Sequence, residues 1–160
     1  IISELERAKF KKVLVVHASD LPHGRGWSPH VWEIINGATD ITLSLLEAED
    51  KVDTGDIWKK VSVSIPKTAL FDEINELIFD SELGLMDFAV ENYSTVETKK
   101  QVNIDSACWP KRGPKDSVID LNKTIFEQFD LIRVCDPQRF PAYFYKDGVR
   151  FNIIIEKHNE

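Results

Sequence analysis

The chain has 160 residues, of which 42% are hydrophobic and 29% are charged. This length and composition are typical of one soluble globular domain, and no apolar run is long enough to cross a bilayer. The net charge of -7 argues against generic binding to a nucleic-acid backbone. The acidic excess lies in residues 1–105, whereas residues 106–160 carry 9 basic and 8 acidic side chains. A polyanionic partner would therefore more easily contact the second part.

The cysteines and histidines show no metal-binding or redox spacing. We expect Cys108 and Cys135 to be free thiols in a reducing cytoplasm. Prolines interrupt the series His17, His23 and His30, which do not share one helical face, so no metal site is expected.

The first strand comes early in the chain. Residues 2–10 (ISELERAKF) have the pattern of the last turns of a helix, and residues 11–17 (KKVLVVH) that of a buried strand. Continuous Val and Leu favour a parallel sheet covered on both faces. A doubly wound sheet usually has more strands before its functional edge, so we expect that N-terminal residues are missing and that this strand has an unpaired edge.

The following segments alternate between helix and strand. Ser28 and Pro29 predict the start of a short helix that Gly37 ends. Strands are predicted over 41–48 and 57–65, on either side of the acidic loop EDKVDTGD (49–56). Thr68 is expected to cap a long helix. Its predicted core face consists of Leu70, Ile74, Leu77, Ile78, Leu85, Met86 and Ala89.

Prolines and a glycine in WPKRGPKDS (109–117) predict a boundary near residues 100–118. We therefore divide the chain into a core unit, 1–105, and a second unit, 106–160, with a linker, a helix over 122–134 and a hairpin. Asp147-Gly148 is typical of the type I′ turn of such a hairpin.

The predicted strand 11–17 ends at His17, and several backbone breakers follow it. Active sites of open α/β sheets lie at the carboxyl ends of strands. Gly24 and Gly26 would let a ligand approach the backbone, and Arg25 would direct a cation into the opening. The structural alternative is that His17 only caps a loop.

Asp53 lies in a turn of the acidic loop. A carboxylate there would hydrogen-bond the imidazole of His17, fix its tautomer and raise its basicity. The alternative is a solvated charged loop. The spacing of Asp50, Asp53 and Asp56 does not fit a calcium-binding loop.

Residues 17–57 contain, in order, His-x-Ser-x-Leu-Pro, a basic residue with glycine, Pro and Trp on a short helix, Asn-Gly, and Asp-x-Gly-Asp. This pattern resembles the signature of the folate-dependent formyltransferases. The matching residues are His17, Ser19, Leu21, Pro22, Arg25, Gly26, Pro29, Trp32, Asn36, Gly37, Asp53, Gly55 and Asp56. Residues 109–145 are similar to that family's later segment, where a Pro-Arg-x-x-Pro-x-Asp stretch precedes a helix ending in Ile-Arg. The resemblance implies an α/β fold: the C-terminal portion of a Rossmann-like formyltransferase sheet, followed by a small helix-plus-β-hairpin segment.

The resemblance also implies a reaction, the transfer of a formyl group from 10-formyltetrahydrofolate to a primary amine. His17 and Asp53 are the positions that match the catalytic pair. The positions assigned to the folate are Ser19, Leu21, Asp50, Val52, Thr54 and Gly55. One departure is Val15, where the family usually has an asparagine that would polarise the formyl oxygen. A non-catalytic folate- or nucleotide-binding relative is therefore an alternative.

We expect the acceptor to be the amine of a nucleotide-linked amino sugar, a small molecule. Trp109, with Lys111 and Arg112, would stack on the base and meet the diphosphate, and Arg25 would be a further substrate-binding residue. The alternative is that WPKRGP is a simple solvated linker. A cleft sized for a nucleotide sugar is expected between the His17 loop and residues 106–115. Methionyl-tRNA is the less favoured acceptor, because of the acidic balance and because the chain ends soon after RFNIII. No membrane partner is expected, and a homodimer is compatible with this interpretation.

Overall fold

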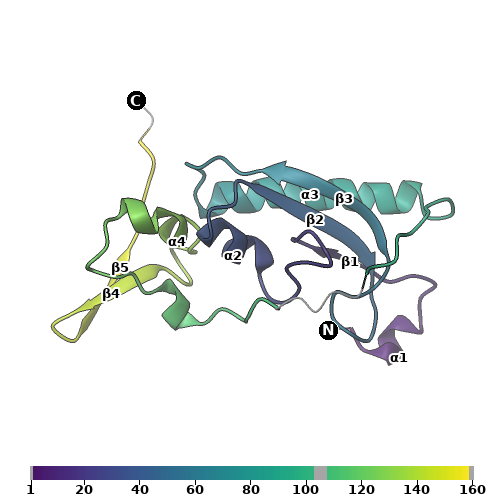
Figure 1. Ribbon diagram of the computed structural model, residues 1–160, viewed down its shortest axis with the longest axis horizontal. Coiled ribbons are helices and arrows are strands. Elements are labelled where there is room, and N and C mark those ends of the chain that lie inside the picture. The colour runs from purple at the N-terminus through teal and green to yellow at the C-terminus, as the bar shows by residue number, and fades with distance from the viewer. Residues whose placement is uncertain (1, 103–107, 159–160) are drawn as a thin grey trace.

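The computed structural model describes residues 2–102 and 108–158 (Figure 1). The elements of the first part are α1 (Glu4–Arg7), β1 (Leu14–His17), α2 (Pro29–Ile35), β2 (Asp40–Glu47), β3 (Ile57–Ser64) and α3 (Phe71–Glu91). Those of the second part are η1 (Pro114–Ser117), η2 (Phe126–Gln128), α4 (Phe129–Arg133), β4 (Ala142–Lys146) and β5 (Val149–Ile153). In these ranges no helix is long and apolar enough to span a membrane.

The main sheet is antiparallel, so the prediction of parallel strands is wrong. Its order is β1-β2-β3, and both neighbouring pairs run in opposite directions. Leu14 pairs with Glu47, and His17 pairs with Ser44. Strand β1 is thus at the edge, and its outer side has no strand partner in the described part of the chain.

The apolar run in β2 reflects burial on both faces. Ile41 and Leu43 belong to the core under α3, whereas Leu46 packs on the opposite face with Leu21 and Ile57. Continuous hydrophobicity therefore correctly indicated a sheet covered on both sides, but it carries no information on strand direction. A bulge between Leu45 and Leu46 shifts the register.

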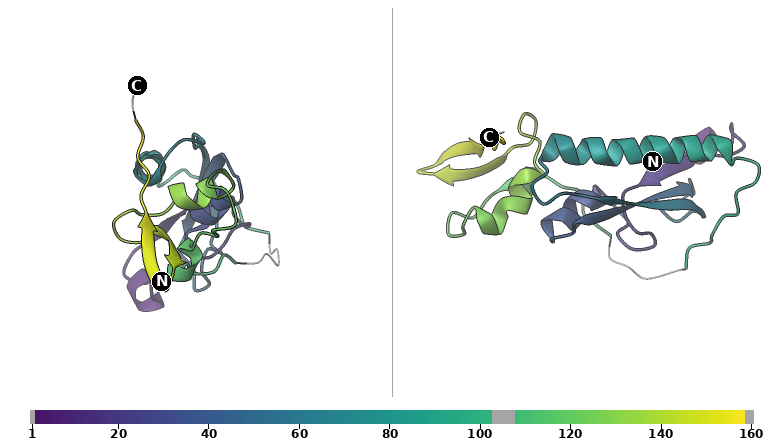
Figure 2. Two further views of the ribbon diagram at one scale, coloured as in Figure 1. Left: turned by 90° about the vertical axis from the view of Figure 1, so that its left-hand side faces the viewer. Right: turned by 90° about the horizontal axis from the view of Figure 1, so that it is seen from above.

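Two helix boundaries differ from those predicted. Helix α1 begins inside the chain, because Ser3 and Glu6 form a capping box, and it is not the end of a longer helix. Helix α3 begins after Leu70 rather than at Thr68, because the Glu73 carboxylate accepts the Leu70 N–H at 2.8 Å. It lies along one face of the sheet (Figure 2). Met86, predicted in its core face, is 56% exposed.

Residues 108–158 have a small core of their own, formed by Ile119, Ile132, Cys135 and Ala142. The helix predicted over 122–134 is limited to η2 and α4. The predicted hairpin turn is confirmed, because Asp147 and Gly148 both have positive φ values, 51° and 79°. The predicted division between residues 105 and 106 lies outside the described residues. Cys108 is an exposed free thiol, and Cys135 a buried one.

Arg133 of α4 joins the second part to the first. Its side chain is buried and binds Asp130 Oδ1 at 2.6 Å, the Pro66 carbonyl at 3.2 Å and the Ala69 carbonyl at 3.1 Å. Both carbonyls lie just before α3. The contact therefore fixes α4 and the hairpin at the N-terminal end of that helix (Figure 2).

Replacing Arg133 with Met should lower the free energy of unfolding by about 3 kcal/mol, because two carbonyls lose a charged donor. Denaturant unfolding of the two proteins measures the difference. Arg139→Met is the matched control, since Arg139 and Asp136 have the same sequence spacing but the arginine side chain is 76% exposed. Its cost should stay below about 0.5 kcal/mol. Equal costs for the two variants would show that Arg133 does not join the two parts.

Candidate active site

His17 and Asp53 face each other across two loops. His17 Nδ1 lies 3.5 Å from Asp53 Oδ1, and both side chains are buried. Strand ends alone do not bring them together, because His17 pairs with Ser44 in the middle of β2. Residues 18–28 turn back along the sheet and meet the β2–β3 loop, 48–56, which carries Asp53. The expected proximity is present, but it results from this loop rather than from parallel strand ends.

The hydrogen bonds of His17 define its tautomer. Nε2 lies 3.0 Å from the Gly24 carbonyl oxygen, which can only accept, so Nε2 carries a hydrogen. In the neutral ring Nδ1 is then an unprotonated base beside the Asp53 carboxylate. A doubly protonated ring would satisfy both neighbours, because each of them is an acceptor. The pair is therefore arranged to hold a proton that arrives at Nδ1.

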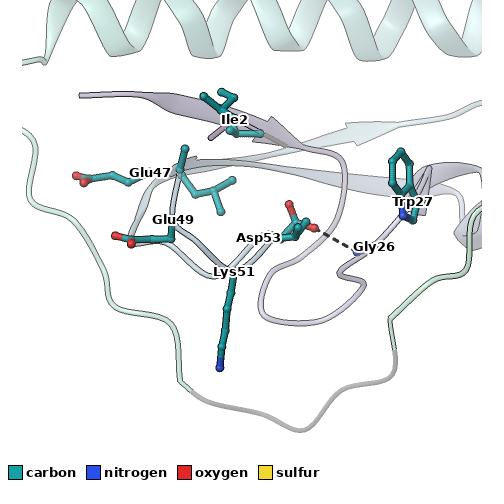
Figure 3. A pocket seen from close by; sticks show the side chains of 11 residues that line it. Ile2, Gly26, Trp27, Glu47, Glu49, Lys51 and Asp53 are labelled. Atoms are coloured by element: carbon teal, nitrogen blue, oxygen red, sulfur yellow. Dashed lines mark hydrogen bonds between the residues drawn. The ribbon is translucent and has the colours of Figure 1, made fainter. Parts of the chain in front are cut away.

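Asp53 is held in an unusual backbone conformation with a φ of +58°. Its Oδ2 accepts the Gly26 backbone N–H at 3.2 Å (Figure 3). Its carbonyl accepts from Arg25 Nε at 3.2 Å and from Gln101 Nε2 at 3.0 Å. Both the carboxylate and the backbone of Asp53 are thus tied to neighbouring segments.

Arg25 and Gln101 form a clamp on the β2–β3 loop. Arg25 donates to Gln101 Oε1 at 2.9 Å, and Gln101 donates to the Gly55 carbonyl at 2.8 Å. The guanidinium of Arg25, predicted to be a free cation for a substrate, is therefore bound within the protein. Gln101 was not identified from the sequence, because a lone glutamine after a helix has no distinguishing pattern.

An apolar cavity of about 360 Å³ opens beside Asp53. Figure 3 shows Ile2, Trp27 and Asp53 among the side chains around it. Val15 and Val52 also line it. Valine at position 15 thus gives this cavity an apolar wall at the position where the resemblance leads one to expect an amide.

Most positions assigned to the folate do not line this cavity. Ser19 and Leu21 are fully buried: Ser19 donates to the His23 carbonyl, and Leu21 is part of the core. They shape the loop, and in this conformation no ligand can reach them. Asp50 is paired with Arg7.

Thr54 and Gly55 hold the β2–β3 loop itself. The Thr54 hydroxyl donates to the Lys51 carbonyl at 2.9 Å. Gly55 packs so closely that an added Cβ would lie 1.9 Å from the Glu47 carbonyl oxygen. Of the six predicted positions, only Val52 lines the apolar cavity.

A second cavity, of about 420 Å³, is also lined by Asp53. Residues 25–27 and 108–111, between which a cleft was expected, both contribute to its lining. The two segments are joined where Trp109 N–H donates to the Arg25 carbonyl at 2.7 Å and Trp27 N–H donates to the Trp109 carbonyl at 3.1 Å. Asp53 and Trp27 line both this cavity and the apolar one.

Gly26 makes this junction possible. Its φ is +110°, and an added Cβ would lie 2.3 Å from the Trp109 carbonyl oxygen. The missing side chain therefore makes room for another part of the chain, not for a ligand as the sequence suggested.

Trp109 and Arg112 are tied into a stack of side chains. The rings of Trp109 and Trp32 lie 5.9 Å apart with an interplanar angle of 11°. The Arg112 guanidinium lies 5.8 Å from the Trp32 ring, and it donates to the Asp116 carbonyl at 3.1 Å. Of the predicted acceptor residues, Lys111 is the exposed one, and its Nζ lies 5.3 Å from the ring centre of Trp27.

Two residues of α2 have shifted pKa values. Burial, with a smaller effect of Asp20, raises the pKa of Glu33 to about 7. Burial lowers the pKa of His30 to about 4, with smaller effects of His17 and Arg112. Within the described residues no group of three potential ligands could hold a metal ion.

Comparisons with known proteins agree with the resemblance. No family model matches the chain. The chain is 30% identical over 145 residues to the methionyl-tRNA formyltransferase of Desulfotalea psychrophila, covering 88% of this chain and 44% of that protein. It spans about half the length of the curated relatives that it matches.

Solved structures share the fold. A methionyl-tRNA formyltransferase from Clostridium thermocellum superposes with a TM-score of 0.76 at 25% identity, over 94% of this chain and 64% of that one. A sugar N-formyltransferase from a Shewanella species gives the same TM-score at 20% identity, over 100% and 67%. The predicted α/β class and formyltransferase fold are confirmed, although the strands described here are antiparallel.

Replacing Glu33 with Gln should change how stability depends on pH. The folded protein keeps the Glu33 proton up to about pH 7, while the unfolded chain loses it near pH 4.5. The wild type therefore loses stability as pH rises through this window. Because Glu33 is half-buried, the difference in unfolding free energy, variant minus wild type, should grow by about 1 kcal/mol between pH 4.5 and pH 8.

Thermal or urea unfolding across this range tests the difference. His30 titrates with the opposite slope, but it is present in both proteins and cancels. Exposed Glu91→Gln is the control and should give a flat difference. A flat difference for Glu33→Gln would contradict the raised pKa.

Replacing Gln101 with Ala should loosen the β2–β3 loop, because two backbone carbonyls lose their donor. We expect hydrogen exchange of the Gly26 amide, which the Asp53 carboxylate holds, to accelerate about tenfold, equivalent to about 1.4 kcal/mol. Gln128→Ala is the control, since Gln128 likewise binds loop carbonyls at 120, 123 and 124, far from the site. Acceleration in both variants would mean general destabilisation rather than a local clamp.

Proposed function

Since this chain belongs to the formyltransferase family, we propose that it transfers a formyl group from 10-formyltetrahydrofolate to a primary amine. One observation carries the proposal: Asp53, whose carboxylate is paired with His17, lines two cavities. A transferase needs its donor and acceptor on either side of the reacting groups. The apolar cavity suits the pterin of the donor, and the second cavity suits the acceptor.

The His17–Asp53 pair suits the proton transfer that this reaction requires. The amine nitrogen attacks the formyl carbon and forms a tetrahedral intermediate, and the nitrogen must then lose a proton. His17 Nδ1, which is unprotonated when Nε2 donates to Gly24, would accept that proton. The adjacent Asp53 carboxylate would stabilise the resulting imidazolium. His17 would then give this proton to the folate nitrogen as the bond between that nitrogen and the formyl carbon breaks, which restores the neutral ring and completes the transfer.

The loop that carries Asp53 lines the donor cavity with Ala48, Val52 and the charged residues Glu49, Lys51 and Asp53. Val15 offers no donor to the formyl oxygen, so we propose that the pair and the loop backbone carry the polar contacts. The competing proposal is that the chain is a non-catalytic relative that only binds folate or a nucleotide, and Val15 is the observation that motivates it.

For the acceptor, a nucleotide-linked amino sugar is the first candidate. The cavity between the His17 loop and residues 108–111 has the volume of a small-molecule site, and Lys111 is an exposed cation on its wall. Methionyl-tRNA is the second candidate, because curated relatives of this chain are named for that acceptor.

Formyl-transfer assays of the natural full-length protein, with nucleotide amino sugars and methionyl-tRNA as acceptors, test the proposal. His17→Gln and Asp53→Asn should each lower kcat at least about 100-fold, because each removes part of the proton-accepting pair. Asp40→Asn, an exposed carboxylate at the start of β2, is the control and should leave kcat unchanged. Absence of transfer by the wild type to every acceptor would favour the non-catalytic class. Efficient transfer to methionyl-tRNA alone would select the second acceptor.

A further inference from the structure

A third cavity, the basic cavity, lies between α2, residues 111–117 and the β4–β5 hairpin. Its volume is about 500 Å³. Four of the residues that line it are cationic, Lys111, Arg112, Arg139 and Arg150, and none is acidic, although the whole chain has a net charge of -7. The cavity is therefore a local region of positive potential on an acidic protein.

The cations are held by aromatic rings rather than by carboxylates. The Arg150 guanidinium lies 3.8 Å from the centre of the Tyr143 ring, and that of Arg139 lies 5.5 Å from Phe140. Lys111 and Arg112 are placed similarly over Trp27 and Trp32. Of these four cations, only Arg139 has a carboxylate of a described residue within 4.0 Å, that of Asp136 at 3.9 Å. Aromatic faces position cations without neutralising them, so the charge remains available to an anion.

Arg112 adds a buried donor to this wall. Its Nε has no hydrogen-bond partner in the described part of the chain. Buried polar atoms of folded proteins are nearly always paired, so an unpaired donor beside a basic cavity points to a ligand acceptor.

The basic cavity continues towards the His17–Asp53 pair. Trp27 and Lys111 line both the basic cavity and the cavity beside Asp53. A ligand with its amine at Asp53 would therefore extend past Trp27 into the basic cavity. Trp27 and Phe140, which are 56% and 59% exposed, offer aromatic faces to a base.

We propose that the basic cavity binds the nucleoside diphosphate part of the amine acceptor, with Arg139 and Arg150 on the diphosphate. Arginine binds phosphate oxygens in pairs, and the three arginines and one lysine are more than enough to balance the negative charge of a diphosphate. A cavity with four cations suits a few phosphates better than a polynucleotide, whose recognition depends on an extended basic surface. The assignment of the ligand as an acceptor rests on the proposed function, whereas the binding itself does not.

Isothermal titration of the natural full-length protein with uridine diphosphate and with thymidine diphosphate, in the absence of folate, tests the binding. Arg150→Gln and Arg139→Gln should each raise Kd about tenfold. Arg139 is largely exposed, so its replacement leaves folding intact even if that of Arg150 does not. Lys146→Gln, an exposed cation on the same hairpin that does not line the cavity, is the control and should leave Kd unchanged.

The dependence on salt adds a second readout. Log Kd should change with log salt concentration by a slope of about 1 to 2, because few phosphates are neutralised. No binding of either diphosphate, or equal Kd values in wild type and both arginine variants, would overturn the inference. Tight binding of tRNA alone, with a much steeper slope, would also overturn it.

The outcomes separate this inference from the proposed function. Diphosphate binding that is weakened by the arginine variants, without formyl transfer to any amine, leaves the inference standing and refutes the proposed function. Formyl transfer with unchanged kinetics in both arginine variants supports the proposed function and refutes the inference.

Discussion

The hydrogen bond between the Asp53 carboxylate and the Gly26 N–H joins the two loops that form the site. Residues 18–28 leave β1 opposite the middle of β2, so nothing in the strand pairing brings them to the β2–β3 loop. The Asp53 carboxylate brings the two loops together, because Oδ2 accepts the Gly26 N–H while Oδ1 faces His17. Gly26 in turn approaches the Trp109 backbone, which positions the start of the second part of the chain. One side chain thus connects both halves of the sequence at the place where the cavities meet.

The residue types of the site could be predicted from the sequence, but their contacts could not. His17 and Asp53 belong to a pattern of helix and strand breakers and turns that can be recognised in a single sequence. The hairpin turn at Asp147-Gly148 follows from local conformational preference. Strand direction was predicted wrongly, because an apolar run records burial and not orientation. Arg25, Ser19 and Leu21 match the signature pattern, and their side chains bind or pack against other parts of the loops, which the pattern did not reveal. Gln101 acts only through long-range hydrogen bonds, which no local pattern reveals.

The basic cavity shows how an acidic chain can offer a cationic surface. Its four cations come from two segments about thirty residues apart: Lys111 and Arg112 from the first, and Arg139 and Arg150 from the second. The net charge argued against generic binding to polyanions, and the structure is consistent with that interpretation. It could not exclude a local site, because the fold brings cations from separate segments onto aromatic rings beside one cavity.

Trp27 lines all three cavities, so its indole ring is a common wall. A rotation of this ring changes the shape of the apolar cavity and of the two others together. If a ligand in one cavity favours one orientation of the ring, it changes the affinity of a ligand in another by a fixed factor. Thermodynamic reciprocity then requires the second ligand to change the affinity of the first by the same factor. Cooperative binding of two ligands is thus available to this protein through one partly exposed aromatic side chain, without movement of the sheet.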